Sequence, residues 1–349
     1  MKARKSSSAS ISSFSFYALL ILSILTFLLM VSCNENPAAA EPQIEGYFDT
    51  ALLNYENYIY SSIPAFGLDN NPINAQQNRA LIYWYNETPP AVSVNQILGY
   101  DVKVNSDQFW TTVLDAVYNP SRKGVYNNGT LSPELRANWG GFFRILPDST
   151  IKKFKKKNLV MKIWFKIVDA PEQAQLNIDL GRISEDIIPN GRLDTEDRNQ
   201  NDLLDQGEDT GIDGIFDVEE PNYNNGNDSD NDDFYLAAGK YEKINGLENN
   251  GLSGERKAPD TEDINRNFTL DKNNDYFSYI IPLQLDKILA TKITEVGNNG
   301  WVLIKIPVDL PDLKVGSPDN SKIETIRLWI TNANQPVHIQ MAQIKFDEI

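Results

Sequence analysis

Residues Trp301–Leu310 read WVLIKIPVDL, and this segment carries a clear strand signature. Apolar residues stand at every second position, at Val302, Ile304, Ile306 and Val308, while Lys305 falls between them. Successive side chains of a β-strand point to opposite faces of its sheet. The alternation therefore predicts a strand that places one face on a core and the other toward solvent.

Six further segments have a similar strand character: Arg79–Asn86, Thr111–Asn119, Leu159–Val168, Tyr276–Leu285, Ile323–Asn332 and Val337–Phe346. Turn signals rich in Gly, Pro and Asn, such as VGNNG and KVGSPDNS, separate them. No long helical period is present. The pattern predicts an all-β chain folded as a β-sandwich.

An acidic, strand-poor stretch at 169–275 interrupts this pattern. From Asp194 to Asp233 the chain has fifteen acidic residues and one basic residue, Arg198. Because good strands flank the stretch, we interpret it as a long insertion in one sandwich. Long loops without structure are uncommon in compact domains, so this insertion needs something that holds it together.

The twelve residues DRNQNDLLDQGE, which start at Asp197, have the spacing of an EF-hand calcium loop. Positions 1, 3, 5, 9 and 12 would supply side-chain oxygens and position 7 a backbone carbonyl. These ligands are Asp197, Asn199, Asn201, Asp205, Glu208 and the carbonyl of Leu203. Position 6 departs from the motif, because Asp202 stands where Gly normally makes the sharp turn.

A second loop repeats this spacing in DINRNFTLDKNN and predicts the ligands Asp263, Asn265, Asn267, Thr269 and Asp271. Its position 12 is the uncharged Asn274, so we expect this site to be weaker or differently closed. Alternate carboxylates in NDSDNDD indicate further metal ligands at Asp228, Asp230 and Asp232. Hard oxygen ligands favour Ca²⁺. The alternative is a solvated acidic loop with Asn and Asp turns.

The first 32 residues predict a lipoprotein signal peptide. A basic start precedes the apolar run Phe16–Val31, which is shorter than the about 20 residues usually needed to span a bilayer. The run ends in LLMVSC at Cys33, the single cysteine, where we expect cleavage and lipid attachment. A chance cysteine after a signal peptide is the alternative. Residues 33–44 would form a flexible tether to a module at 45–349.

Composition excludes several functional classes. The formal net charge of −16 disfavours nucleic acid and anionic lipid headgroups as partners. The single histidine, His338, lies in a strand pattern, where a packing role is more usual than a catalytic one. Without a second histidine or an unmodified cysteine, Cys–His catalysis and His-based metal hydrolysis are disfavoured. The sequence thus predicts a protein that is not an enzyme.

Several stretches together resemble a known family. They include YNPSRKGVYNN, DLGRISEDIIPNGRLDTED, GEDTGIDG and IRLWITNANQPVHIQMAQIKF. These are similar to the repeating extracellular module of SprA-type proteins, which serve gliding motility and type IX secretion. The resemblance covers about Arg79–Phe346. It implies a sandwich of the jelly-roll or galactose-binding type and a role at the cell envelope.

The combined expectation is a calcium-stabilised outer-membrane lipoprotein, on the periplasmic face or the cell surface. It would act as a binding or assembly module for envelope or secretion proteins. Because fold does not determine function, the link to secretion rests on analogy. The alternative is a carbohydrate-binding surface lipoprotein, in which Trp110 and Trp139 would stack on sugar rings.

Overall fold

The computed structural model describes residues 48–65, 72–100, 109–127, 129–220, 223, 228–251 and 258–348. The chain divides into two compact units, Met1–Glu45 and Gly46–Ile349, and the described residues all lie in the second. The predicted signal peptide, Cys33 and the tether fall outside the described residues. Among the described helices, none has the length and apolar character needed to cross a membrane.

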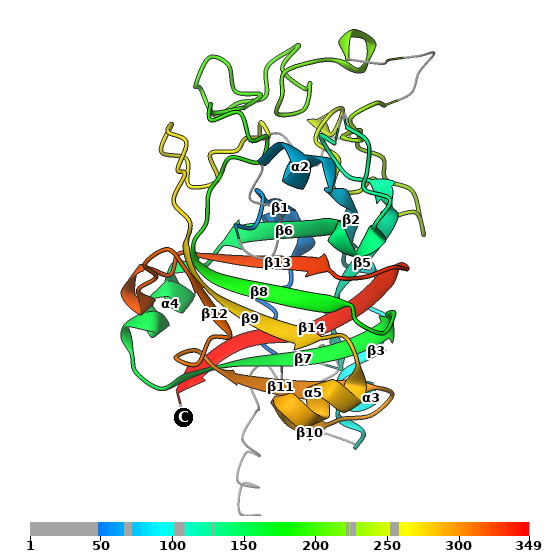
Figure 1. Ribbon diagram of the computed structural model, residues 1–349, viewed down its shortest axis with the longest axis vertical. Helices are drawn as coiled ribbons and strands as arrows, with labels where there is room; N and C mark the ends of the chain where they lie inside the picture. Colours follow the sequence, from blue (N-terminus) through cyan, green and yellow to red (C-terminus); the bar gives the residue numbers. More distant parts are fainter. Residues whose placement is uncertain are drawn as a thin grey trace, which may run out of the picture. The chain divides into compact units, whose positions relative to one another are not determined.

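The first of two large sheets has six strands, all paired antiparallel (Figure 1). Its spatial order is β1, β6, β13, β8, β9 and β12. The bounds are Ile59–Tyr60 for β1, Trp139–Ile145 for β6, Thr325–Thr331 for β13, Gln175–Arg182 for β8, Asp275–Pro282 for β9 and Leu313–Val315 for β12.

The second large sheet is also six-stranded and antiparallel, in the order β10, β11, β7, β14, β5 and β2. The bounds are Ile293–Val296 for β10, Trp301–Pro307 for β11, Leu159–Asp169 for β7, Val337–Glu348 for β14, Leu114–Lys123 for β5 and Ala80–Tyr85 for β2. A separate pair joins β3 (Val92–Ser93) and β4 (Trp110–Thr111).

Short helices connect the strands. The α-helices are α2 (Pro72–Gln77), α3 (Val94–Leu98), α4 (Asp148–Ile151) and α5 (Leu285–Thr291). The 3₁₀ turns are η1 (Tyr55–Asn57), η2 (Leu135–Ala137), η3 (Lys152–Lys155), η4 (Asp217–Glu219) and η6 (Asn320–Lys322). Such short helices fit the absence of a long helical period in the sequence.

The two large sheets share one hydrophobic core. Phe142 and Ile178 of the first sheet belong to the same buried cluster as Ile163 and Ile304 of the second. The predicted β-sandwich is therefore confirmed. All seven predicted strands are present, as β2, β5, β7, β9, β11, β13 and β14.

The predicted limits of the insertion need correction, because β8 lies inside 169–275 and is a central strand of the first sheet. Its side chains are buried on both faces, so it lacks the alternation of a half-exposed strand. The strand also contains the charged residue Asp179, which is fully buried and forms an ion pair with Arg327 at 2.7 Å. The strand-poor insert is residues 183–274, which join β8 to β9.

The insert docks against β2, an edge strand of the second sheet. Trp84 N–H donates to Oδ1 of Asn245 at 2.9 Å, and Nδ2 of Asn245 donates to the Trp84 carbonyl at 3.0 Å. The ring of Tyr241 stacks on Tyr85 with a centroid separation of 3.9 Å. An unpaired edge is prone to pairing with another chain, so these contacts also shield the sheet.

We predict that Asn245→Ala destabilises the protein by about 1–3 kcal/mol, because it leaves a buried N–H and a buried carbonyl of Trp84 without partners. Urea unfolding followed by tryptophan fluorescence would measure the loss. Asn57→Ala, at an exposed asparagine, is the control and should change the free energy of unfolding by no more than about 0.5 kcal/mol. Equal losses in both variants would contradict this role of Asn245.

Candidate metal centre in the acidic insert

The side chains of the first loop, Asp197–Glu208, converge on one carboxylate. Oδ2 of Asp205 accepts hydrogen bonds from the side-chain amides of Asn199 at 2.7 Å and Asn201 at 2.9 Å. The Asp197 carboxylate accepts the backbone N–H groups of Asn201 and Asp202, both at 2.9 Å. The side chains at positions 3, 5 and 9 therefore lie together, and the side chain at position 1 holds the backbone turn at positions 5 and 6.

The second loop, Asp263–Asn274, repeats these contacts position by position. Oδ2 of Asp271 accepts from Asn265 at 2.8 Å and from Asn267 at 3.0 Å. The Asp263 carboxylate accepts the backbone N–H of Asn267 at 2.9 Å and of Phe268 at 2.6 Å. Two segments of different composition thus fold to the same local structure.

Both loops also share their backbone turns. Positions 4 and 6 are left-handed in each, with φ of 59° and 60° at Gln200 and Asp202, and of 55° and 60° at Arg266 and Phe268. Glycine adopts this conformation without steric cost, which is why the motif has it at position 6. The missing glycine therefore leaves the turn in place. The turn costs conformational energy, above all at the bulky Phe268.

The two loops pair directly before their first ligands. Glu196 N–H donates to the Asp260 carbonyl and Glu262 N–H donates to the Asp194 carbonyl, each at 3.0 Å. This is an isolated antiparallel bridge. The two contacts are reciprocal, so the loops are related by a local two-fold arrangement.

Glu196 and Glu262 are fully buried, and backbone N–H groups satisfy their carboxylates. Glu196 accepts from Thr210 at 3.0 Å, and Glu262 accepts from Ile188 at 2.8 Å. Each also accepts the N–H of its bridge partner, at 2.7 and 3.0 Å. The ligand spacing predicts neither residue. The recurrence of Asp-Thr-Glu-Asp at 194–197 and 260–263 is the signal that could have found them.

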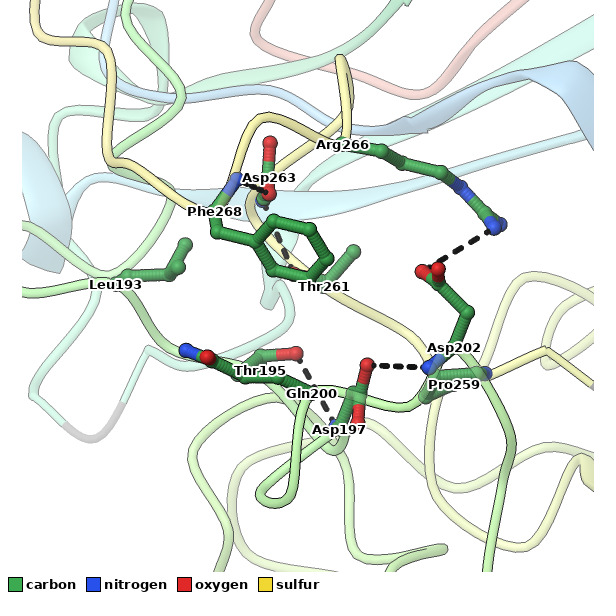
Figure 2. A pocket seen from close by; sticks show the side chains of 10 residues that line it. All are labelled: Leu193, Thr195, Asp197, Gln200, Asp202, Pro259, Thr261, Asp263, Arg266 and Phe268. Carbon is green, nitrogen blue, oxygen red and sulfur yellow. Dashed lines mark hydrogen bonds and ion pairs between the residues drawn. The ribbon is translucent and has the colours of Figure 1, made fainter.

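Figure 2 shows the pocket that lies between the paired loops. Asp197 and Asp263 approach it from opposite loops, and Phe268 and Leu193 line it between them. Nη1 of Arg266 reaches from the second loop to within 3.7 Å of a carboxylate oxygen of Asp202 in the first. Both partners are exposed, so this ion pair adds little stability.

The carboxylate that closes the first loop is Glu208, as the spacing predicts. Its N–H donates to the Asp205 carbonyl at 3.1 Å, and Asp205 N–H donates to its Oε2 at 2.9 Å. In the second loop Asn274 does not take this place; its side chain accepts from Ser184 N–H at 3.3 Å.

Glu185, which follows β8, closes the second loop instead. Its N–H donates to the Asp271 carbonyl at 2.8 Å, and Asp271 N–H donates to its Oε2 at 3.1 Å. These are the two contacts of Glu208 reproduced from a distant part of the chain. The Glu185 side chain is buried, and this burial raises its pKa to about 7. Nothing local in the sequence pointed to Glu185.

The donor sets of both loops fit a calcium ion. Each brings together two aspartates, two asparagines and one glutamate, and every side chain offers an oxygen. The predicted position-7 residues, Leu203 and Thr269, lie in the same loops. We therefore retain the predicted ligands and add Glu185 to the second loop.

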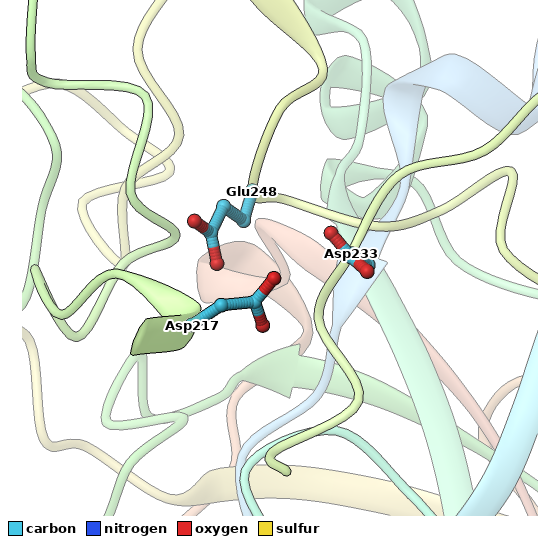
Figure 3. A group of neighbouring side chains, drawn as sticks. All are labelled: Asp217, Asp233 and Glu248. Carbon is cyan, nitrogen blue, oxygen red and sulfur yellow. The ribbon is translucent and has the colours of Figure 1, made fainter. Parts of the chain in front are cut away.

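The third predicted group also comes together. Asp228, Asp230 and Asp232 each offer a carboxylate oxygen, and these oxygens lie within 4.8 Å of one another. Glu248, Asp217 and Asp233 form an adjoining group (Figure 3). Nζ of Lys243 lies 2.6 Å from Asp228 and 3.2 Å from Asp233.

The aromatic candidates separate into two environments. Trp110 is 50% exposed and packs edge-to-face against Phe109, with centroids 5.2 Å apart. Trp139 is fully buried, and its indole N–H donates to the Ala75 carbonyl at 2.8 Å. A buried ring has no face to offer a sugar, so the stacking role predicted for Trp139 is corrected to a core role.

His338 lies on β14 beside β5. Its Nε2 is 2.7 Å from Oδ1 of Asp115, which also accepts from the side-chain amide of Gln340 at 2.9 Å. Asp115 is buried, and the histidine side chain is 28% exposed. This is a cross-strand polar contact on the sheet surface.

Comparison with known proteins identifies part of the chain. Residues 235–347 match the SprA_N family model, described as a motility related/secretion protein. The SprA-type resemblance is confirmed. The matched residues contain the second loop and run from there through β9 and into β14. Ahead of residue 235, the resemblance remains a prediction from the quoted stretches.

Comparison with solved structures finds a distant similarity. A similar solved structure is the X-ray crystal structure of a carbohydrate-binding module specific for non-crystalline cellulose. It has 10% sequence identity and a TM-score of 0.24, over 74% of this chain and 96% of that chain. No curated protein matches the chain.

We predict that Glu185→Gln and Glu208→Gln each reduce the stabilisation by calcium. At tenfold excess over Kd, one site adds about 1.4 kcal/mol to the free energy of unfolding. Each variant should lose up to about that amount, because the amide keeps the hydrogen bond to backbone N–H and removes the charge. Urea unfolding in calcium and in EGTA measures this difference.

Asn274→Ala is the matched control, because position 12 of the second loop does not close it. This variant should keep the full response to calcium. If calcium does not stabilise the wild type, the loops do not hold calcium through these carboxylates. The same conclusion follows if both glutamine variants respond to calcium as strongly as the wild type.

Proposed function

We propose that this chain is a lipid-anchored, calcium-stabilised module of the bacterial cell envelope that binds or assembles other proteins and catalyses no reaction. The observation that carries the proposal is the match of residues 235–347 to a motility and secretion family. A place in type IX secretion or gliding is the corresponding role. The outer membrane, on its periplasmic face or at the cell surface, is the corresponding location.

In this proposal calcium serves the fold. The insert has few strands and many carboxylates, so bound cations would offset repulsion that would otherwise loosen it. The paired loops connect to the sandwich through short links. One is Arg79, a buried residue near β2 whose Nη2 donates to the Ile187 carbonyl at 2.6 Å, while Ile188 N–H donates to Glu262. Ion binding would thus determine how the insert presents its surface.

The lipid anchor in the proposal depends on Cys33, which follows the apolar run in LLMVSC. We predict that Cys33→Ala moves the protein from the membrane fraction to the soluble fraction, or blocks its processing. Detergent phase separation and metabolic labelling with a fatty acid measure this. Unchanged partition together with unchanged processing would contradict the anchor.

Envelope or secretion proteins are the partners that fit the proposal, since the net charge of −16 disfavours nucleic acids and anionic lipids. Calcium-dependent order in the insert would make the association calcium-dependent as well. Carbohydrate binding is the second candidate, favoured by the exposed pair of Phe109 and Trp110. Exposed aromatic rings are suited to stack on sugars.

One experiment separates the two candidates. We expect crosslinking on intact cells, in calcium, to capture components of a secretion or motility machine identified by mass spectrometry. The double variant Glu185→Gln/Glu208→Gln should capture severalfold less, and Trp110→Ala should capture as much as wild type.

A glycan array tests the carbohydrate-binding candidate. A specific glycan signal that falls at least tenfold in Trp110→Ala, and stays in the exposed-residue control Leu310→Ala, would favour the carbohydrate-binding candidate. Turnover of any glycan by the wild-type protein would contradict the proposal that it is not an enzyme.

A further inference from the structure

Beside the paired loops, the insert buries a second group of carboxylates, which we call the buried acidic cluster. Its members are almost entirely withdrawn from solvent. Their exposed fractions are 6% for Glu220, 2% for Asp230, 0% for Asp232 and 3% for Glu248. Burial of an ionised carboxylate costs several kcal/mol per ion unless partners compensate it.

Each member of the cluster retains one oxygen without a hydrogen-bond donor in the part of the chain that the structure describes. These atoms are Oε1 of Glu220, Oδ1 of Asp230, Oδ1 of Asp232 and Oε2 of Glu248. Buried polar atoms in folded proteins nearly always have a partner, so four such atoms in one place require an explanation.

The four side chains come from three stretches of the insert, because Asp230 and Asp232 share one, and they converge on Asp232. Glu220, Asp232 and Glu248 each bring a carboxylate oxygen within 4.8 Å of the others. Asp228 and Asp230 meet Asp232 at the same distance. Figure 3 shows Glu248 of the cluster beside Asp217 and Asp233, whose carboxylate oxygens lie within 4.8 Å of it.

Donors hold the second oxygen of Asp232 and of Glu220 in place. Tyr126, in the turn that follows β5, donates its hydroxyl to Oδ2 of Asp232 at 2.8 Å. Ser229 donates its N–H and its hydroxyl to Oε2 of Glu220, at 2.9 and 2.6 Å. The free oxygens are therefore presented by side chains that are already oriented, as in a preformed site.

Positive charge near the cluster is scarce. Within the described ranges, Lys243 pairs with Asp228 and Asp233 at the rim, and its side chain is 40% exposed. Arg198 turns elsewhere and donates to the Gly214 carbonyl at 2.9 Å. No ion pair among the described residues neutralises Glu220, Asp230, Asp232 or Glu248.

We propose that a calcium ion occupies the buried acidic cluster, held by Glu220, Asp230, Asp232 and Glu248 and supported by Asp228. The donors are all carboxylate oxygens, which calcium prefers and binds in flexible geometry. This site is separate from the two loops, because none of its ligands belongs to the ligand set of either loop. The ion would join those segments to Tyr126 and so to the sandwich.

A buried site with this much charge should release its ion far more slowly than an exposed loop. Loops outside the cell commonly bind calcium at about 10⁻⁴ to 10⁻³ M and lose it on dialysis. After dialysis of the purified full chain against metal-free buffer, we expect about one calcium ion to remain per chain. The loop variant Glu185→Gln/Glu208→Gln should retain it as well, which separates this site from the loops.

Glu220→Gln tests the cluster, and the exposed neighbour Glu219→Gln is its matched control. By elemental mass spectrometry, Glu220→Gln should retain at least tenfold less calcium than the control after dialysis. Its melting temperature should fall in calcium and rise in EGTA, because the change removes a ligand from the occupied site and a repelling charge from the empty one. Glu248→Gln should behave in the same way.

A buried acidic cluster without a bound ion would give a different set of results. If dialysed wild type holds no calcium, and if Glu220→Gln raises or leaves unchanged the melting temperature in both buffers, the cluster contains shared protons and no ion. That outcome overturns the proposal, whatever the loops do. If neither glutamine variant folds, the calcium content of wild type and of the loop variant still decides.

Discussion

Hydrogen bonds from backbone N–H groups to carboxylates are the interaction on which the insert depends. The described residues of 183–274 belong to none of the sheet strands, so their backbone groups need other partners. Glu196 and Glu262 each receive two N–H groups, and Asp197 and Asp263 do the same inside their loops. Here acidic side chains satisfy the backbone donors that a sheet ladder or a helix would satisfy elsewhere.

Two kinds of carboxylate follow from this constraint. The carboxylates of the paired loops accept hydrogen bonds from backbone N–H groups. Some lie near the surface, and the buried ones have hydrogen-bond donors. Those of the buried acidic cluster keep oxygens that the described protein atoms do not satisfy. The same residue type therefore serves as backbone partner in one place and as candidate cation ligand in another, and only the surroundings distinguish the roles.

The insert and the sandwich are joined by apolar and by polar contacts. Four apolar residues of the insert belong to the core that the two sheets share: Ile183, Ile187, Ile212 and Leu247. Asn245 bonds both backbone groups of Trp84 on the edge strand β2, Tyr126, which follows β5, donates to the buried acidic cluster, and Glu185 connects β8 to the second loop. A cation bound in the insert would therefore act on the sheets as well. These contacts explain how the insert is part of the same compact unit as the sheets.

Local patterns in the sequence were sufficient for seven strands and for both loops, because alternation and ligand spacing are set by neighbouring residues. The central strand β8 was not predicted from the sequence. Its burial on both faces removes the alternation of apolar and polar residues, and the buried Asp179–Arg327 pair places a charged residue within it. Glu185, Glu220 and Glu248 acquire their roles from segments far away along the chain. Only the tertiary structure could decide them, because contacts between distant residues leave no period in the sequence.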